Sequence, residues 1–572
     1  MFSGKKGIPQ SIDYYDELVK GNYYYVDKTL LVKDVLDNGS KVTLYARPRR
    51  FGKSINLSML DCFFNIDGHG KGLFDGTAIM REGERYTSEM GRYSVVKLTM
   101  KEMKQPNFEG AELNFRRIIQ KAWREHDYLK KNQELTEEDR KLFKDVVSGQ
   151  MSTADLAISL PELMRLLQIH HKAPTVLLID EYDVPLEAGY TGGYYQQVLS
   201  LVRTMMSSSC KDNPYLRLSV HTGCLRIARE SLYTGFNNPT INTVLSEDGG
   251  DLFGFTESEV QALLDYYELG HLMPVVRKWY DGYIFGNSEI YNPWSVLHFA
   301  YAARINPARA AKPYWMNTSG NDLLVDLIRT TVGGGGARND IENLLEGGTV
   351  KRTVNENVNY DSLRQERDAI WNMLLFTGYL KPMEPPDFTL NDNHVPLKLV
   401  NLEVQVILRQ KVETWYGQLY HSGQQAPFVA ALEDGRPEDA ELLLNRLLTL
   451  TVSYHDREEN FYHGFIAGLL AGMPAHNCLS NHEGGDGRPD IQLMAEDHSA
   501  ALVVEVKNAG DASGPALQKA AEHALAQAAG QTYDRELRLL GFRRVHTYGI
   551  ACFAKRCRIL MMEEQAAPDR KI

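Results

Sequence analysis

The chain has 572 residues, of which 63 are basic and 74 acidic, so its formal net charge is −11. This balance excludes a uniformly basic protein that coats nucleic acid non-specifically, and any polyanion site must therefore be a local patch. The six cysteines include no C-x-x-C pair, which argues against a zinc site and a disulfide framework and indicates a reducing compartment. The N-terminus has no apolar signal region and no apolar run reaches the ~20 residues of a membrane helix, so we expect a cytoplasmic protein without a membrane partner.

The first informative segment is a short apolar strand expected at residues 41–46, KVTLYA, followed by RPRRFGKS and a stretch with apolar residues at helical spacing. Strand, loop and helix in this order are typical of the phosphate-binding motif G-x-x-x-x-G-K-[ST]. Arg47 stands where that motif has its first glycine, and this replacement restricts the backbone. The segment GKS could also simply begin a helix. If the loop does bind phosphates, its backbone N–H groups wrap them at the start of the helix.

Within such a loop Lys53 would reach the β- and γ-phosphates of the nucleotide, and Ser54 would bind Mg²⁺. The arginines of the loop would add positive charge beside the phosphates. The residues that we expect around the nucleotide are Arg47, Arg49, Arg50, Phe51, Gly52, Lys53 and Ser54.

Two further strands are expected at residues 173–186, APTVLLIDEYDVPL, and 216–224, LRLSVHTGC. Strands that alternate with helices predict a parallel α/β sheet, with ligands at the carboxyl ends of the strands. Asp180 would bind the same Mg²⁺ as the loop, and Glu181 could orient the attacking water. Thr222 could sense the γ-phosphate, although TG after a strand is often only a turn. Arg226 or Arg229 could act as an arginine finger.

From about residue 255 to 410 the pattern is mainly helical, with segments such as TESEVQALLDYYEL and NPWSVLHFAYAA. The stretches WYDGY, YNPWS and NTSGND are dense in aromatic and polar residues. We expect the aromatic residues to form the core of a helical lid domain; a surface that stacks nucleic-acid bases is the alternative.

Residues 487–510, GRPDIQLMAEDHSAALVVEVKNAG, predict two short strands joined by a polar turn. Glu505 and Lys507 are two residues apart on the second strand and therefore lie on one face, and pairing of the strands would bring Asp490 beside Glu505. Two carboxylates suit Mg²⁺, and Lys507 could orient a water and steady a pentavalent phosphate. An exposed hairpin with solvated charges is the alternative. The Ala-rich helix that follows could support the site through Gln527 and Tyr533.

Together, RPRRFGKS, LLIDEYDVPL and the C-terminal PD-x14-E-x-K hairpin resemble AAA-ATPase-like proteins that carry a PD-(D/E)XK nuclease domain. The stretches YYVDKTLLV, DLFGFTESEV, KWYDGYIFG, YNPWSV, YWMNTSGND and FYHGFIAGLL also match that family. Its members carry arginine in the degenerate loop, so Arg47 is no departure, and Pro489 is not diagnostic because other residues precede the Asp in many members. Ala528 and Gln531 replace the usual Ile and Lys of the last helix.

The resemblance implies an α/β protein with an N-terminal P-loop ATPase-like parallel sheet in residues 1–254 and a helical lid or linker domain in 255–410. A restriction-endonuclease-like α/β/α domain would follow in 411–572. It also implies ATP and Mg²⁺ or Mn²⁺ as cofactors, with nucleic acid, DNA before RNA, as the partner; a homo-oligomer is compatible with this reading.

The leading hypothesis is a nuclease whose metal-dependent cleavage is controlled by ATP, with defence against phage or mobile DNA as an expectation by analogy. The alternative is a nucleotide-dependent switch whose nuclease-like fold binds without cutting. The net charge of −11 mildly favours the alternative, whereas the intact Asp490, Glu505 and Lys507 oppose it. A motor that remodels nucleic acid ranks last, because separate helicase motifs are not apparent.

Overall fold

The chain forms two compact units, one of Met1–Thr331 with Asn343–Leu408 and the other of Val332–Glu342 with Arg409–Ile572. The expected mixed α/β class is confirmed, since the first unit contains a parallel sheet and the second a mixed sheet. Most of the expected lid region belongs to the first unit, and the domain boundaries at 254 and 410 stay predictions. The computed structural model describes residues 4–226, 239–315, 336–356, 368–384, 394–410, 425–451, 459–471, 473, 475–480, 490–529 and 537–562.

The N-terminal sheet has the strand order β2-β3-β4-β1-β5, and all four pairings are parallel. Its strands are rich in Val, Ile, Leu and Thr and almost wholly buried, as expected for a sheet covered on both faces. Because the strands are parallel, their carboxyl ends meet at one edge. The strands are β1 (Val42–Ala46), β2 (Ser94–Thr99), β3 (Thr175–Asp180), β4 (Leu216–Gly223) and β5 (Thr240–Asn242).

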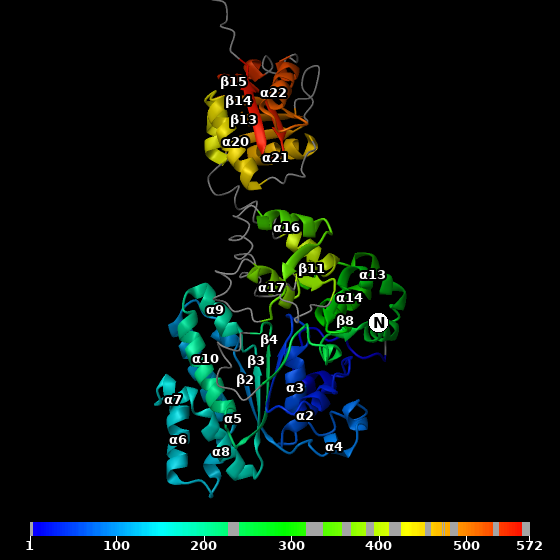
Figure 1. Cartoon of the computed structure of the whole chain (residues 1–572), viewed down its shortest axis with the longest axis vertical. Helices are drawn as coiled ribbons and strands as arrows, with labels where there is room; N and C mark the ends of the chain where they lie inside the picture. The colour runs from blue at the N-terminus through cyan, green and yellow to red at the C-terminus, as the bar shows by residue number, and fades with distance from the viewer. Residues whose placement is uncertain are drawn as a thin grey trace, which may run out of the picture. The chain divides into compact units, whose positions relative to one another are not determined.

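Helices cover both faces of this sheet, with α2 and α3 on one side and α5, α8 and α10 on the other (Figure 1). The helix α5 shows why they form: Asn107 caps its first turn through Gly110, and its buried residues recur every three or four positions. The helices are α1 (Tyr15–Lys20), α2 (Leu31–Asp37), α3 (Lys53–Phe64), α4 (Glu84–Thr87), α5 (Phe108–Glu125), α6 (Glu137–Ser148), α7 (Thr153–Ala157), α8 (Leu160–His171), α9 (Val184–Gly192) and α10 (Tyr195–Cys210).

The rest of the first unit combines helices with two small antiparallel sheets, ordered β6-β8-β7 and β10-β11-β9. The aromatic residues Tyr280, Tyr283 and Tyr291 are buried, which confirms that WYDGY and YNPWS contribute to a core; NTSGND lies outside the described residues. The elements are α12 (Glu257–Tyr266), α13 (Met273–Tyr280), α14 (Pro293–Ala303), α17 (Ala369–Phe376), β6 (Phe255–Thr256), β7 (Tyr283–Phe285), β8 (Ser288–Tyr291), β9 (Val350–Thr353), β10 (Leu380–Pro382) and β11 (His394–Leu399). The helix α16 (Gly336–Leu345) spans a boundary between the units.

The second unit is built on a sheet ordered β12-β13-β14-β15-β16, in which only β14 and β15 run parallel. The expected pair of strands is present, and the Ala-rich helix that follows begins at Gly514. The strands are β12 (His476–Ser480), β13 (Ile491–Ala495), β14 (Ala500–Asn508), β15 (Arg544–Phe553) and β16 (Arg556–Met561), and the helices are α19 (Gln425–Glu433), α20 (Pro437–Thr451), α21 (Glu459–Ala471) and α22 (Gly514–Ala529).

The two faces of β14 pack against different helices. Leu502, Val504 and Val506 belong to the large core that includes α19, α20 and α21. The odd-numbered residues of a strand point the other way, and Glu505 accordingly meets Gln527 of α22. This alternation places Glu505 and Lys507 together on the face that α22 covers.

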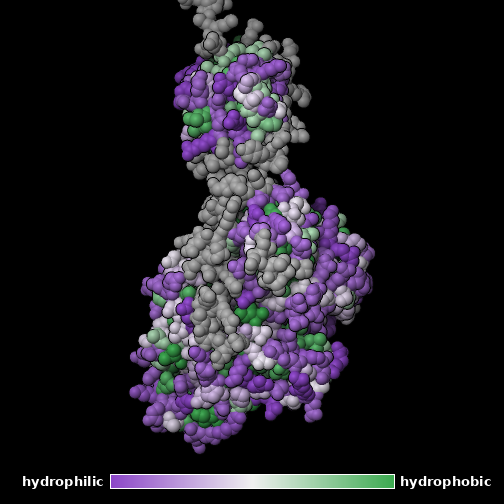
Figure 2. All heavy atoms as spheres, in the orientation of Figure 1, coloured by the Kyte–Doolittle hydropathy of each residue, from purple (hydrophilic) through white to green (hydrophobic). Residues whose placement is uncertain are grey.

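The surface visible in Figure 2 is mainly hydrophilic on each unit, with small and separate hydrophobic areas. This view therefore offers no large apolar docking surface. Among the helices of the described ranges, none combines the length and the apolar character that a membrane crossing requires.

Candidate functional site

The loop between β1 and α3 closes around the side chain of Lys53. Arg50 and Gly52 both have positive φ, 70° and 82°, so the chain turns sharply before α3 begins. The Lys53 ammonium donates hydrogen bonds of 2.9 and 2.8 Å to the carbonyl oxygens of Arg47 and Pro48. Glycine at 52 adopts this left-handed conformation without the strain that Arg50 incurs. The expected tight loop at a helix N-terminus is thus present, and phosphate binding by it stays a prediction.

Three expected site residues from three elements meet at the carboxylate of Asp180. The hydroxyl of Ser54, on α3, donates to Asp180 Oδ2 at 2.6 Å, and the hydroxyl of Thr222, on β4, donates to Asp180 Oδ1 at 2.6 Å. A hydroxyl and a carboxylate oxygen side by side are the hard donors that Mg²⁺ prefers, so this pair fits the metal of a nucleotide site. Thr222 is therefore a partner of Asp180 as well as the end of a strand.

Glu181 and Asp183 follow β3 and border the same space. Glu181 adopts a positive φ of 54°, which is a strained conformation for a residue with a side chain. Its burial, followed by the charge of Asp180, raises the pKa of Glu181. Asp183, which the sequence did not single out, accepts hydrogen bonds from the N–H groups of Cys224 and Leu225 at 2.8 and 3.0 Å. The carboxylate of Asp183 therefore fixes the turn after β4.

A cavity of about 410 Å³ opens above the loop, entirely within the first unit. This volume lies within the range of small-molecule sites. The loop, the acidic residues after β3, the N-terminal segment and α14 all contribute to its lining. Its lining includes Arg49, Arg50, Phe51, Gly52, Lys53, Ser54, Glu181 and Asp183, with Ser11, Asp13, Tyr24, Tyr25, Lys28, Lys101, Lys104, Cys224, Trp294, Leu297 and His298.

Apart from Glu181, the cavity residues outside the loop were not among those predicted from the sequence. Lys101 and Lys104 follow β2, and Trp294 and His298 lie one turn apart on α14, with ring centroids 4.1 Å apart. The position of the lysines after a strand of the parallel sheet was a usable signal. The sequence held no signal for the aromatic pair, because Trp294 and His298 are far from the loop in sequence and approach it only in the folded chain.

The side chain of Arg47 corrects one expectation. It is fully buried and donates to the backbone and side-chain oxygens of Asn242 on β5, and it does not line the cavity. Burial lowers the pKa of Arg47 to about 10. The guanidinium is held between β1 and β5 because the buried oxygens of Asn242 accept its hydrogen bonds. The proposed phosphate contacts therefore do not include the side chain of Arg47.

The other loop arginines lie at the cavity. Arg49 donates to Glu187 on α9 at 2.7 Å, and the guanidinium of Arg50 lies over the ring of Trp294 at 4.1 Å. Phe51 is buried and packs its ring against Tyr283, with centroids 4.8 Å apart. Phe51 thus joins the loop to the small sheet of β6, β7 and β8.

Arg226 is not among the residues that line the cavity. Its guanidinium forms an ion pair of 2.8 Å with Glu356, whose other carboxylate oxygen accepts a hydrogen bond from Thr243. The structure thus does not bring Arg226 to the loop, and Arg229 lies outside the described residues.

In the second unit, Asp490 and Glu505 lie side by side as expected. Ile491 pairs with Val504, so Asp490 stands opposite Glu505 at the next position of the two strands. The Asp490 carboxylate accepts a hydrogen bond from the Val506 N–H at 2.8 Å, and the Asp490 N–H donates to Glu505 Oε2 at 3.4 Å. Burial, followed by the charge of Asp490, raises the pKa of Glu505. Two such carboxylates match the donor set of a divalent metal.

Lys507 and Gln527 complete this second cluster. The Lys507 ammonium lies 3.5 Å from Glu505 Oε1, and the Gln527 amide donates to the same oxygen from α22. Tyr533 lies outside the described residues. His463, on α21, was missed: its Nε2 lies 2.9 Å from the carbonyl oxygen of Asp490. The stretch FYHGFIAGLL that contains it had no assigned chemistry, so the sequence offered only the histidine itself as a signal.

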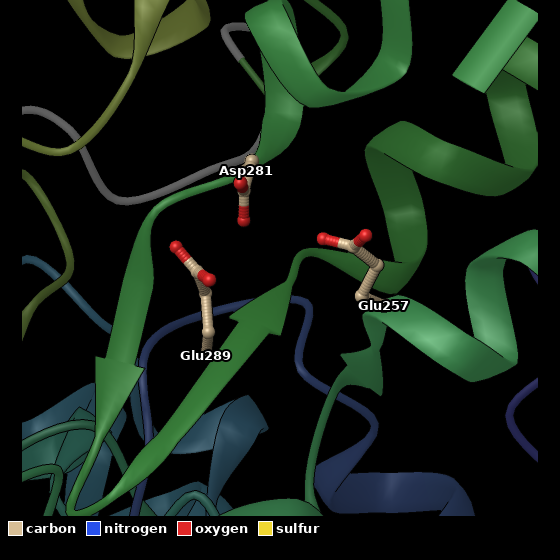
Figure 3. A group of neighbouring side chains, drawn as sticks. All are labelled: Glu257, Asp281 and Glu289. Atoms are coloured by element: carbon tan, nitrogen blue, oxygen red, sulfur yellow. The ribbon is translucent and has the colours of Figure 1, made fainter. Parts of the chain in front are cut away.

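A third acidic group lies in the first unit, where Glu257, Asp281 and Glu289 point toward one another (Figure 3). Their carboxylate oxygens lie within 4.8 Å of one another. Glu257 forms an ion pair with Arg277 at 2.5 Å, and burial followed by the charge of Glu289 raises the pKa of Asp281. The arginine neutralises part of this charge, and we assign no function to the group.

The two folds and their clusters define a protein that combines a P-loop ATPase-like unit with a nuclease-like unit. Comparison with known families agrees: residues 9–233 match the family model described as predicted AAA-ATPase, and residues 457–562 match that of the PD-(D/E)XK nuclease superfamily. The chain therefore contains an AAA-ATPase-like domain and a PD-(D/E)XK nuclease superfamily domain.

One relative is an uncharacterised protein in the vnfD 5′ region of Azotobacter chroococcum, 26% identical over 326 residues. The match covers 57% of this chain and 56% of that relative. The chain thus aligns with little more than half the length of this relative, and the name of the relative gives no activity.

Proposed function

We propose that this protein is an ATP-regulated, metal-dependent nuclease that cleaves phosphodiester bonds, with DNA as the favoured substrate and defence against foreign DNA as its role. The observation that carries the proposal is the cluster of Asp490, Glu505 and Lys507 on one face of a hairpin. A domain that only binds has no need of two adjacent carboxylates with a lysine beside them. The location that suits this role is the cytoplasm, in keeping with six free cysteines.

In the nuclease unit, Asp490 and Glu505 would hold Mg²⁺ or Mn²⁺ through their carboxylate oxygens. A bound cation would neutralise charge on the phosphate and make a coordinated water more acidic. Lys507, next to Glu505, would orient that water toward the phosphorus and stabilise the negative charge of the pentavalent phosphate. Gln527 would keep the Glu505 carboxylate in place from α22.

In the first unit, ATP would lie in the cavity with its phosphates on the loop and the N-terminus of α3. Lys53 would exchange the carbonyl oxygens of Arg47 and Pro48 for phosphate oxygens, while Ser54 and Asp180 would hold Mg²⁺. Glu181 would orient the attacking water. The base would lie against Trp294 and His298, which supply aromatic faces in the lining of the cavity.

A non-catalytic switch is the second candidate. It is favoured by the ion pair between Arg226 and Glu356, because the guanidinium of the expected arginine finger is engaged there and does not line the cavity. A protein of this kind would bind ATP, hydrolyse it slowly and bind nucleic acid without cleavage. The intact metal-type carboxylates of the second unit oppose this reading.

The test follows cleavage of supercoiled and linear DNA, with RNA alongside, in Mg²⁺ or Mn²⁺ and with or without ATP. It compares the wild type with Glu505→Gln and Lys53→Ala. We expect cleavage to be lost in Glu505→Gln and to lose its response to ATP in Lys53→Ala. Equal inertness of all three proteins, combined with retained binding of nucleotide and DNA, would favour the switch.

A further inference from the structure

The carbonyl group of Asp490 lies just beyond the β-sheet. The pairing of β12 with β13 ends at Ser480 and Ile491, one residue after Asp490. Among the residues that the structure describes, the pairing of β12 does not extend to Asp490, and a partly buried carbonyl at this position needs a donor. The imidazole of His463 supplies one, with Nε2 at 2.9 Å from the Asp490 oxygen. A carbonyl oxygen only accepts hydrogen bonds, so Nε2 is the donor.

His463 reaches this carbonyl from the side of the sheet opposite to the carboxylate pair. Its helix, α21, packs in the large core through Tyr462, Ile466, Leu469 and Leu470, on the face that also holds Ile491 and Val504. Glu505 points to the other face, where it meets α22. The imidazole therefore acts on the backbone of Asp490 and is separated by the sheet from the carboxylates themselves.

The helix that carries His463 is itself held in place. Tyr462, the preceding residue, is buried and donates its hydroxyl to the carbonyl oxygen of Ala554 at 3.2 Å. His463 is therefore anchored on a packed helix, and its hydrogen bond ties the start of β13 to that helix.

We propose that His463 is a positioning residue of the nuclease unit, which sets the affinity for the divalent metal by holding Asp490 opposite Glu505. The inference rests on the proposed function, because it concerns the same metal site. Asp490 is held at three points: its N–H on Glu505, its carboxylate under the Val506 N–H, and its carbonyl on His463. Loss of the third lets the first residue of the hairpin turn away from Glu505.

The role depends on a donor at a given reach, and two substitutions separate donor from shape. His463→Gln keeps an N–H group at a position like that of Nε2, whereas His463→Phe keeps the ring and loses the donor. Substitutions of groups that orient metal ligands weaken metal binding by about 10- to 100-fold. We expect a loss of about this size in His463→Phe and near-wild-type affinity in His463→Gln.

The experiment measures Mn²⁺ binding to the full-length protein by calorimetry without nucleic acid, and then the Mn²⁺ dependence of DNA cleavage. In His463→Phe the half-saturating Mn²⁺ concentration should rise about tenfold or more, while cleavage at saturating Mn²⁺ stays close to that of the wild type. His476→Phe is the matched control, because His476 pairs with Ala495 at the other end of β13 and bonds to Glu433. Its Mn²⁺ affinity should not change.

Two results would overturn the inference: equal Mn²⁺ affinity in His463→Phe and the wild type, or equal weakening in His463→Phe and His463→Gln. His463→Leu, a smaller donor-free change, replaces the Phe variant if thermal unfolding shows that the latter does not fold. Failure of the proposed function looks different: the wild type would then bind no Mn²⁺, or bind it as well as Glu505→Gln does, and the inference would fall with it. Binding that requires Glu505 but not His463 would overturn the inference alone.

Discussion

The two units assemble their sites in different ways. In the first unit, Ser54 lies more than a hundred residues before Asp180 and Thr222 in the sequence. The hydroxyl groups of Ser54 and Thr222 both donate to the carboxylate of Asp180. In the second unit, Asp490 and Glu505 come from one hairpin, and burial, followed by the charge of Asp490, raises the pKa of Glu505. The first site thus places one carboxylate under two hydroxyl donors. The second brings two carboxylates together beside the donors of Val506, Lys507 and Gln527, and a cation would neutralise their charge.

This difference indicates that the fold alone arranges the side chains of the first site, whereas the arrangement of the second site depends on its metal. Substitutions in one unit should then leave the binding reaction of the other unit intact. The expected outcomes below follow that separation, from the largest effect to the smallest.

Asp490→Asn should have the largest effect. It removes one of the two metal carboxylates, and cleavage should fall by more than about a hundredfold, since changes to mere supporting partners already cost up to that much. A plasmid-nicking assay measures the loss, and binding of a fluorescent ATP analogue should stay at the wild-type level. A parallel loss of ATP binding would break the separation between the units.

Asp180→Asn should act in the first unit alone. It removes the charge that holds the hydroxyls of Ser54 and Thr222, and charge-assisted hydrogen bonds of this kind contribute about 1.5–3 kcal/mol each. Equilibrium titration should show Mg²⁺-dependent ATP binding weakened by about 10- to 100-fold, with cleavage in the absence of ATP unchanged. Asp127→Asn changes an exposed carboxylate and serves as the control. Unchanged Mg²⁺ dependence would remove Asp180 from the site.

Trp294→Ala should sharpen where the base lies. Stacking of a base on an aromatic side chain contributes about 1–3 kcal/mol, so ATP affinity should fall about five- to a hundredfold, whereas affinity for inorganic tripolyphosphate should not. Tyr301→Ala, on the exposed side of the same helix, is the matched control. Equal losses for ATP and tripolyphosphate would place Trp294 at the phosphates, where it already contacts Arg50.

Glu403→Gln should have the smallest effect, and on stability only. Glu403 is buried and accepts hydrogen bonds from Ser295, Tyr314 and Trp315. Burial raises the pKa of Glu403 to about 7. Because the folded pKa exceeds the unfolded one, the stabilisation is full below about pH 4.3 and is lost as the pH rises through about 7.

The measurement is thermal unfolding between pH 4 and 8. The wild type should lose on the order of 2–4 °C more than Glu403→Gln as the pH rises. Parallel curves for the two proteins would show that Glu403 does not titrate over this range. The response of the unfolding temperature to Mn²⁺ should be unchanged in Glu403→Gln and altered in Glu505→Gln. This contrast again separates the two buried carboxylates.

The nuclease hairpin could be predicted almost entirely from its sequence. A period of two places Glu505 and Lys507 on one face, and a short polar turn sets which residue lies opposite Asp490. The loop before α3 was equally visible, because Gly52, Lys53 and Ser54 occupy adjacent positions between a strand and a helix. Both are local patterns, in which residue spacing alone decides geometry.

The remaining contacts depend on tertiary structure. Arg47 belongs to the loop in sequence, yet its guanidinium turns to Asn242, because β5 pairs with β1 and presents buried oxygens there. Trp294 closes the cavity from a helix that begins more than two hundred residues after the loop. Neither contact has a sequence signal of its own, since long-range packing selects which side chains meet.

By itself, then, the sequence determined the class of fold, the phosphate-type loop, and the pair of carboxylates with a lysine in the hairpin. Only the tertiary structure decided which partners three side chains have. Arg47 is buried and donates to Asn242, Arg226 pairs with Glu356, and His463 donates to the carbonyl oxygen of Asp490. The physical reason is that strand and helix periods act over a few residues, whereas buried polar groups must find partners wherever the packed fold brings a donor or an acceptor.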